Sequence, residues 1–185
     1  MPGIASAQKM TAPHWTASDP DFSSMFYKPY EAAARKVLLL LDDTRKMLCR
    51  HTGRDCVRAM TFRLKTPASI REKLLKKGLP PSSAAASAAL RDIAGLRAVL
   101  TDEEAVYRYA ELICRSTVIE HLATNDYIAC PKKSGYRSLH LLFRVPVCLH
   151  GQIMMVPAEI QLRTAAMDIW ASIEHDICYK PIIHA

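Results

Sequence analysis

The pattern that most restricts the fold is a pair of alternating segments at residues 136–147 and 152–163. Because successive side chains of a β-strand point to opposite faces, polar residues at every second position predict one organised face. The first polar set is Tyr136, Ser138 and His140, and the second is Glu159, Gln161 and Arg163. A turn near His150-Gly151 predicts that the two strands form a hairpin. Its polar face would carry an aromatic ring, a carboxylate and cations, which together suit a nucleotide.

The other periodicities predict a chain that mixes helices and strands. Helical patterns cover residues 29–50, 67–77, 102–121 and 164–179, and strand patterns cover 56–65, 92–100 and 127–130. Residues 82–89, rich in Ala and Ser, fit a short helix or an ordered loop. This order predicts an α+β fold, with a mixed, mainly antiparallel β-sheet of about five strands packed with helices. The last helix would bury a stripe of apolar residues, namely Ala166, Ile169, Trp170, Ile173 and Ile177.

Length and composition favour one folded domain. The chain has 185 residues, half of them apolar, which is enough to bury a substantial core. We expect residues 1–24 to be a flexible segment, from which Trp15 or Phe22 could dock on the body, and residues 25–185 to form a single domain. The sequence contains neither an apolar run of about 20 residues nor a secretion signal, so we expect no membrane contact and a cytoplasmic location.

The charge of the chain favours anionic partners. A formal net charge of +7 and a pI of about 9.2 suit nucleotides, RNA or both. A solvated basic surface without any partner is the alternative. The six cysteines include no C-x-x-C pair, which favours reduced thiols.

A cluster of cations is predicted where the strand at 56–65 leads into a helix. Arg63 and Lys65 share one face of the strand, and Ser69, Lys73 and Lys76 follow at i, i+4 and i+7 of the helix. Four cations and a hydroxyl on adjoining faces can hold a triphosphate, which arginine grips through two parallel hydrogen bonds. The alternative is a solvated basic face of a helix.

Two carboxylates are candidates for a metal site. Asp92 stands in the motif D-I-A-G-L-R at the mouth of a buried strand, where it could bind Mg²⁺ or cap a turn. Glu159 stands between apolar neighbours on its strand, and a carboxylate there loses hydration unless a cation compensates. Mg²⁺, Arg97 or Arg163 could supply that charge. A purely structural salt bridge between Glu159 and Arg163 is the alternative.

From about Arg63 to Lys180 the chain resembles the synthetase domain of the RelA/SpoT family, and most of all its small single-domain members. The motifs that carry the resemblance are R-x-K followed by S-x-x-x-K, then D-I-A-G-L-R, K-K-S-G-Y-R-S-L-H and A-E-I-Q-L-R. The resemblance implies a nucleotidyltransferase-like catalytic domain with the activity of a GTP/GDP pyrophosphokinase. Such an enzyme transfers pyrophosphate from ATP to the ribose 3′-hydroxyl of GDP or GTP, making (p)ppGpp and AMP, with Mg²⁺ as cofactor.

The resemblance also implies a role for each candidate residue. The ATP-binding group would be Arg63, Lys65, Ser69, Lys73, Lys76 and Arg97. Asp92 and Glu159 would hold the metal, and Glu159 would accept the proton of the attacking hydroxyl. Tyr136 would stack on the acceptor's purine. The rest of the acceptor site would be Lys132, Arg137, Ser138, His140, Gln161 and Asp168, with Asp168 reading the guanine edge.

The acceptor and the assembly stay open at the level of sequence. Toxin-type relatives use the same donor on the 3′ end of tRNA or on adenosine nucleotides, and Lys132-Lys133 would suit RNA contact through a basic surface. A module that binds RNA without catalysis would not need Asp92 and Glu159. An oligomer is possible, although the C-terminal helices that assemble small family members are not expected in this chain.

Overall fold

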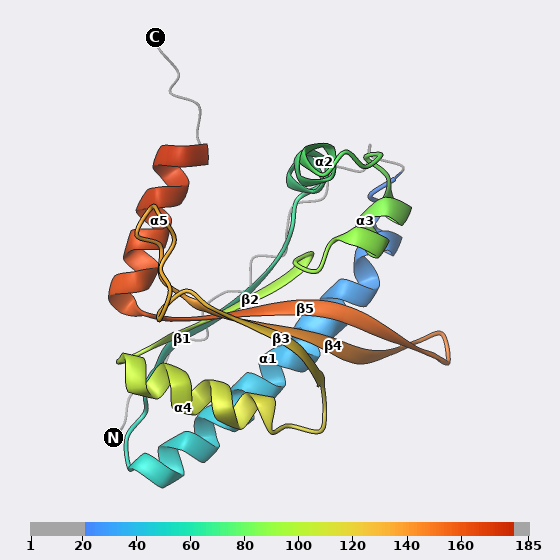
Figure 1. Cartoon of the computed structure of the whole chain (residues 1–185). Helices are drawn as coiled ribbons and strands as arrows, with labels where there is room; N and C mark the ends of the chain where they lie inside the picture. The colour runs from blue at the N-terminus through green and yellow to red at the C-terminus, as the bar shows by residue number, and fades with distance from the viewer. Residues whose placement is uncertain (1–20, 180–185) are drawn as a thin grey trace.

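The computed structural model describes residues 21–179, with side chains described as far as residue 174. Its elements form one five-stranded sheet with helices on both sides (Figure 1). The helices are α1 (Ser24–Thr52), α2 (Pro67–Lys76), α3 (Ser83–Ala89), α4 (Glu103–Cys114) and α5 (Ala165–Tyr179). The strands are β1 (Val57–Leu64), β2 (Ala94–Leu100), β3 (Glu120–Asp126), β4 (Leu139–Leu149) and β5 (Gln152–Thr164).

The sheet is mixed and mainly antiparallel, as the sequence predicts. Its strand order is β1-β2-β5-β4-β3, and only β2 and β5 run parallel. The predicted hairpin is β4–β5, which turns at His150 and Gly151 with positive φ at both residues. The hairpin places β5, which is late in the sequence, beside β2, which is early. This pairing brings the two predicted halves of the site together.

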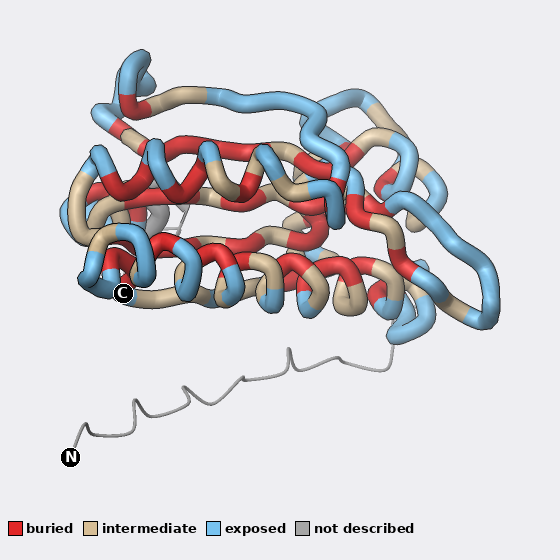
Figure 2. Tube along the Cα trace, turned by 90° about the horizontal axis from the view of Figure 1, so that it is seen from below, coloured by how far each residue is buried: buried red, intermediate tan, exposed pale blue. Residues whose placement is uncertain are grey.

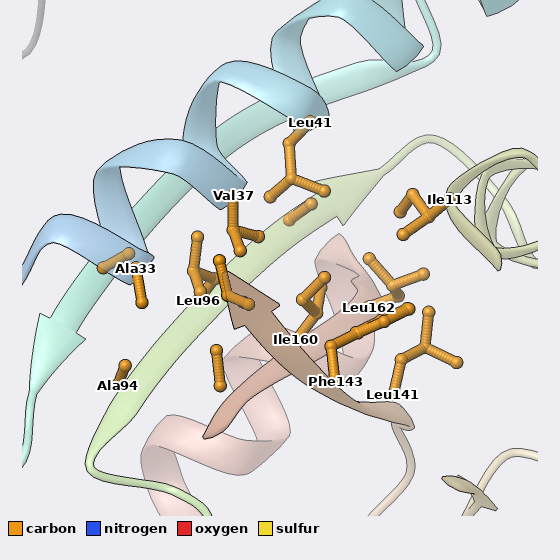
Figure 3. Close-up of a cluster of buried hydrophobic side chains, with 14 of the residues drawn as sticks. Ala33, Val37, Leu41, Ala94, Leu96, Ile113, Leu141, Phe143, Ile160 and Leu162 are labelled. Atoms are coloured by element: carbon orange, nitrogen blue, oxygen red, sulfur yellow. The ribbon is translucent and has the colours of Figure 1, made fainter. Parts of the chain in front are cut away.

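One face of the sheet forms the hydrophobic core. Helices α1 and α4 lie along this face (Figure 1), and both contact the strands beneath them. Val37 and Leu41 of α1 pack over Leu96, Phe143 and Ile160 of three neighbouring strands (Figure 3). Buried positions run through the strands and recur along the helices that cover them (Figure 2). Burial of apolar surface on this scale is the main stabilising contribution to such a fold.

The opposite face of the sheet carries the polar positions of the same strands. Helices α2 and α5 stand on this side, at opposite ends of the sheet (Figure 1). Thr66 caps α2 by accepting a hydrogen bond from the Ser69 amide, and Pro67 occupies the first helical position, as is common in helices. The polar face is therefore bordered by α2 near β1 and by α5 near the end of β5.

Two predicted boundaries in the middle of the chain are wrong. The helix predicted to reach residue 121 ends at Cys114, and the strand predicted at 127–130 lies at Glu120–Asp126 instead. Asp126 explains the second error, because its side chain accepts hydrogen bonds from the amides of Ile128 and Ala129 and folds the chain into a turn there. Ser116 bends the chain in a similar way by accepting from the Val118 amide.

The first polar segment also starts later than predicted. Strand β4 begins at Leu139, so Tyr136 and Ser138 lie in the irregular segment that leads into it. At the other end of the chain, α1 begins at Ser24 and carries Pro29 inside it. Phe22 is buried against Phe26, which agrees with its expected docking on the body. Trp15 lies outside the described residues.

The predicted buried stripe of α5 is also wrong. Ile169, Trp170 and Ile173 are exposed, whereas Met167 and Ala171 make the buried side of the helix. Ala166 is exposed as well, and the side chain of Ile177 lies outside the described part. The helix is apolar on more than one side, so periodicity alone did not identify the side that faces the sheet. Among the described residues, no helix is both long and apolar enough to cross a membrane.

Candidate active site

The strand register gathers the candidate residues on the polar face. Arg63 on β1 pairs with Gly95 on β2, which in turn pairs with Glu159 on β5. One step further, Arg97 pairs with Gln161, and Gln161 with His140 on β4. Directly opposed residues of neighbouring strands project to the same side of a sheet. Gly95 has no side chain, so no side chain of β2 stands between Arg63 and Glu159 at this position of the polar face.

Asp92 lies against two lysines at the entry to β2. Its Oδ2 atom accepts hydrogen bonds from Lys73 Nζ at 2.7 Å and from Lys65 Nζ at 3.2 Å. Burial acts to raise the pKa of Asp92, but the hydrogen bonds and charges of the two lysines outweigh it, and the pKa lies below its ordinary value. The Oδ1 atom is buried and has no hydrogen-bond partner. Asp92 is therefore ionised at neutral pH and keeps one free ligand atom.

The other members of the predicted donor group border this carboxylate at greater exposure. Arg63 is exposed and makes no ion pair with any residue that the structure describes. Lys76 pairs with Glu72 on the outer side of α2, and Ser69 hydrogen-bonds to Thr66 at the start of that helix. Arg97 pairs with Asp168 of α5 at 2.9 Å. Lys65 and Lys73 thus lie against Asp92 at the entry to β2, whereas Arg97 lies in the middle of β2 and reaches toward α5.

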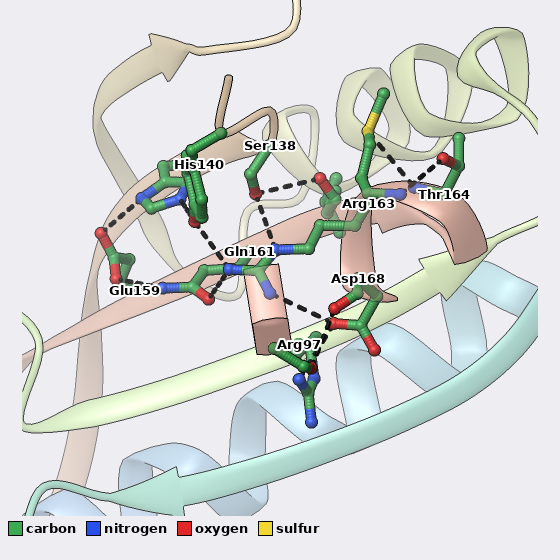
Figure 4. A network of polar contacts seen from close by, with 12 residues as sticks. Arg97, Ser138, His140, Glu159, Gln161, Arg163, Thr164 and Asp168 are labelled. Atoms are coloured by element: carbon green, nitrogen blue, oxygen red, sulfur yellow. Dashed lines mark hydrogen bonds and ion pairs between the residues drawn. The ribbon is translucent and has the colours of Figure 1, made fainter. Parts of the chain in front are cut away.

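Glu159 is held through both of its carboxylate oxygens. His140 Nδ1 lies 2.9 Å from Oε1, and Gln161 Nε2 donates to Oε2 at 2.9 Å (Figure 4). Burial and the nearby charge of Asp92 act to raise the pKa of Glu159, but the hydrogen bonds of His140 and Gln161 outweigh them and lower it. Neither Arg97 nor Arg163 contacts Glu159, so the structure shows no salt bridge with Arg163, and of the cations considered for this carboxylate only Mg²⁺ stays open.

Tyr136 forms the centre of the predicted acceptor site. Only 7% of the residue is exposed, and its hydroxyl contacts His140 Nε2 at 2.8 Å and Arg163 Nη2 at 2.6 Å. The Lys132 ammonium lies over the ring, 4.5 Å from its centroid. Gly135 takes a left-handed conformation in the loop before Tyr136, and a side chain there would meet the Trp170 indole at 3.6 Å. The ring is thus fixed at its hydroxyl end, and a flexible cation covers its face.

Two predicted acceptor residues have partners away from this face. Arg137 pairs with Glu103 in the first turn of α4, the helix that covers the core side of the sheet. Ser138 is fully buried, where its hydroxyl donates to the Leu162 carbonyl and accepts from Arg163 Nε. The alternation of residues 136–140 failed to predict this, because strand geometry begins only at Leu139. The structure places Arg137 and Ser138 outside the group that surrounds Glu159.

Arg163 is the residue whose importance the sequence analysis missed. It was considered only as a partner for Glu159, yet its side chain is 7% exposed and contacts Ser138, Tyr136, Gln161 and Asp168 (Figure 4). Asp168 accepts hydrogen bonds from both Arg163 and Arg97 through one oxygen. An arginine on the polar face of β5, two residues from Gln161 and four from Glu159, was the available signal.

The carboxylates fit a magnesium ion of the kind that binds with nucleotides. Mg²⁺ is often held by one or two carboxylates together with substrate phosphates and water. Asp92 and Glu159 supply two ionised carboxylates on one face, and Asp92 keeps a buried oxygen without a partner. Within the described residues there is no group of three or more His, Cys, Asp and Glu that could hold a metal ion. This donor set matches an ion shared with phosphate groups and not a closed protein cage.

These features define a class of protein. A mixed sheet whose polar face combines two carboxylates with a surrounding group of cations is suited to transfer of phosphoryl groups, where positioning and electrostatic stabilisation dominate catalysis. Comparison with known proteins gives the family. Residues 62–183 match the model described as "Region found in RelA / SpoT proteins". The chain belongs to the RelA/SpoT family, as the sequence motifs predicted.

The relatives include small alarmone synthetases. The chain is 38% identical to the GTP pyrophosphokinase YwaC of Bacillus subtilis over 128 residues, which are 69% of this chain and 61% of YwaC. It is 33% identical to YjbM of the same organism over 84% of this chain and 72% of YjbM. The structure of small alarmone synthetase 1 from Bacillus subtilis bound to its product pppGpp matches with a TM-score of 0.76 and 32% identity, over 84% of this chain and 78% of that chain. The fold and the enzyme class predicted from the motifs agree with these relatives.

Proposed function

We propose that this chain is a GTP/GDP pyrophosphokinase that transfers pyrophosphate from ATP to the 3′-hydroxyl of GDP or GTP. The observation that carries the proposal is that Asp92, held by Lys65 and Lys73, lies near enough to Glu159 for its charge to act on the pKa of that carboxylate. A carboxylate base, a second carboxylate for a metal and cations for the donor phosphates are the parts that such a transfer needs. The similarity to a synthetase bound to pppGpp supports the same assignment. A cytoplasmic location is part of this proposal.

The donor nucleotide would bind across β1, β2 and α2. Lys65 and Lys73 hydrogen-bond to Asp92 and can exchange that carboxylate for donor phosphates, and Arg63 has no ion-pair partner to give up among the described residues. Ser69 and Lys76 lie on the same helix as Lys73, and Arg97 lies further along β2 toward α5. Charge-assisted hydrogen bonds of this kind fix the phosphates in line for attack.

The acceptor would bind between Tyr136 and Glu159. Its purine would stack on Tyr136 after the Lys132 ammonium moves off the ring toward the acceptor's phosphates. Glu159 would accept the proton of the 3′-hydroxyl as this oxygen attacks the β-phosphorus of ATP and AMP leaves. The lowered pKa keeps the Glu159 carboxylate ionised, and so without a proton of its own, at neutral pH. His140 and Gln161 would keep the carboxylate in place during the transfer.

Asp92 and Glu159 would hold Mg²⁺, which when bound offsets negative charge on the phosphates. The free Oδ1 atom of Asp92 supports this role, because a buried ionised oxygen without a partner is costly. Arg137 pairs with Glu103 and the Ser138 hydroxyl donates to the Leu162 carbonyl, so the proposal does not rest on either residue as an acceptor contact. Asp168 accepts hydrogen bonds from Arg97 and Arg163. Its proposed role is therefore to hold these two arginines, in place of the predicted contact with the guanine edge.

The proposal is tested by incubating the protein with ATP and separating the products. The reaction mixtures contain GDP, GTP, tRNA or no acceptor other than ATP itself. We expect AMP and 3′-pyrophosphorylated guanosine nucleotides in the presence of Mg²⁺, and none after the metal is chelated. Glu159→Gln should lower kcat by about 10²- to 10⁴-fold, the usual contribution of a general base, while ATP binding persists.

The matched control is Glu120→Gln on the edge strand β3, where the carboxylate pairs with Arg144 at the surface. This variant should keep the wild-type rate. Product on tRNA or on adenosine nucleotides alone would overturn the guanosine acceptor but keep the donor chemistry. No transfer to any acceptor, or unchanged turnover in Glu159→Gln, would refute the mechanism.

A further inference from the structure

We propose that Arg163 is a positioning residue that holds the base Glu159 through two hydrogen-bonded arms and holds Arg97 through a third. Arg163 does not contact Glu159 itself. The two residues are four apart on β5, a spacing of about 13 Å along a strand. The role of Glu159 as a base rests on the proposed function, whereas the hydrogen-bond network around Arg163 rests on the geometry alone.

The Arg163 guanidinium is buried and donates hydrogen bonds from all three of its nitrogens. Its Nε donates to Ser138 Oγ at 3.3 Å, its Nη1 to Asp168 Oδ1 at 3.1 Å, and its Nη2 to Tyr136 Oη at 2.6 Å and Gln161 Oε1 at 2.9 Å. The guanidinium carbon also lies 5.2 Å from the centroid of the Tyr136 ring. A buried charge requires such compensation, so the partners and the arginine hold one another in a single arrangement.

The first arm runs through Gln161. A guanidinium can only donate hydrogen bonds, so the atom of Gln161 that faces Arg163 must be the amide oxygen. The amide nitrogen of Gln161 then faces Glu159 and donates to its Oε2 atom at 2.9 Å. Arg163 thereby orients the amide in the one way that serves a carboxylate.

The second arm runs through Tyr136 and His140. The Tyr136 oxygen accepts from Arg163 and lies 2.8 Å from His140 Nε2. An ionised carboxylate can only accept, so His140 Nδ1, 2.9 Å from Glu159 Oε1, is the donor of that contact. Both oxygens of Glu159 therefore receive a donor, and both chains of hydrogen bonds start at Arg163 (Figure 4).

The third arm reaches the donor side of the site. Asp168 accepts from Arg163 and also from Arg97 Nη1 at 2.9 Å. Arg163 thus connects the predicted acceptor ring, the base and an arginine of the predicted ATP group. A displacement of about 1 Å in a catalytic group can cost a hundredfold in rate, so loss of this hub should be felt at the chemical step.

The first test replaces Arg163 by lysine, which keeps the charge but cannot reach four partners. We expect kcat for pyrophosphate transfer to fall by at least tenfold per folded molecule. The matched control is Arg45→Lys, because Arg45 also makes a multidentate contact, with Asp55, but on the exposed side of α1. Wild-type kcat in Arg163→Lys, with only a loss of stability, would mean a merely structural role and would overturn the proposal.

The second test needs no activity and so separates this inference from the proposed function. Urea midpoints are measured without nucleotide for Arg163→Lys, Glu159→Gln and the double variant. We expect the shift of the double variant to be smaller than the sum of the single shifts. Glu159→Gln removes the carboxylate that accepts from Gln161 and His140, so the loss of Arg163, which holds those donors in place, should cost less in that background. Additive shifts would overturn the network. Absence of transfer in the wild type would refute the proposed function, while this cycle would still decide the role of Arg163.

Discussion

Replacement of Ile160 by alanine tests the division of β5 into a core face and a site face. Ile160 is 0% exposed and lies in the core cluster, between Glu159 and Gln161 in the sequence but on the opposite face of the sheet. The substitution removes three buried carbon atoms. At about 0.8 kcal/mol for each buried methylene, transfer alone costs about 2.4 kcal/mol.

The cavity left behind adds to this loss. Neighbours from α1, β2 and β4 surround the site and relax only partly, so we expect a total of about 3–4 kcal/mol, within the usual range for Ile→Ala. For a chain of this size, that loss in the free energy of unfolding corresponds to a fall in Tm of about 6–16 °C. The kcat of the folded molecules should change little, because the side chain points away from Glu159.

Urea unfolding followed by circular dichroism measures the loss, and the slope m should stay constant. The matched control is Ile153→Ala on the same strand, where the side chain is 76% exposed and the expected change is within about 0.5 kcal/mol. Ile160→Val provides a milder version, with an expected cost of about 1 kcal/mol. Equal losses at residues 153 and 160 would refute the assignment of faces, and so would a loss below 1 kcal/mol in Ile160→Ala.

Two further predictions concern charged side chains. Asp102 caps α4 by accepting from the Ala105 amide, which lowers the pKa of Asp102, so Asp102→Ala should cost about 1 kcal/mol at pH 7. This stabilisation exists above the unfolded-state pKa of about 3.9 and is lost as the pH falls through the lower folded-state pKa, so the urea midpoints of wild type and variant should converge below about pH 4. Lys73→Met should raise KM for ATP about tenfold or more, the worth of a charge-assisted hydrogen bond, whereas the surface variant Lys46→Met should not. Unchanged KM in Lys73→Met would remove Lys73 from the donor site.

Local periodicity predicted most of the elements correctly. The strand at β1, the helix α2 with its Thr66 cap and the β4–β5 hairpin all follow from patterns within a few residues. The errors fall where a side chain competes with the regular structure, as at Asp126, or where a helix has apolar residues on several sides, as at Trp170. Pattern cannot settle such cases because the deciding partner is distant in the sequence or is a backbone amide in a turn.

The sequence by itself determined the chemical inventory: the family, the mixed sheet, the alternation that puts Glu159 and Gln161 on one face, and the cations that precede Asp92. Tertiary structure decided the partners. Pairing of β2 with β5 brought Asp92 toward Glu159, although 66 residues separate them in the chain. It gave Glu159 a histidine in place of an arginine, and made Arg163 the hub that joins Tyr136, Gln161 and Asp168. The physical reason is that alternation states which way a side chain points, whereas strand order and register state what it meets.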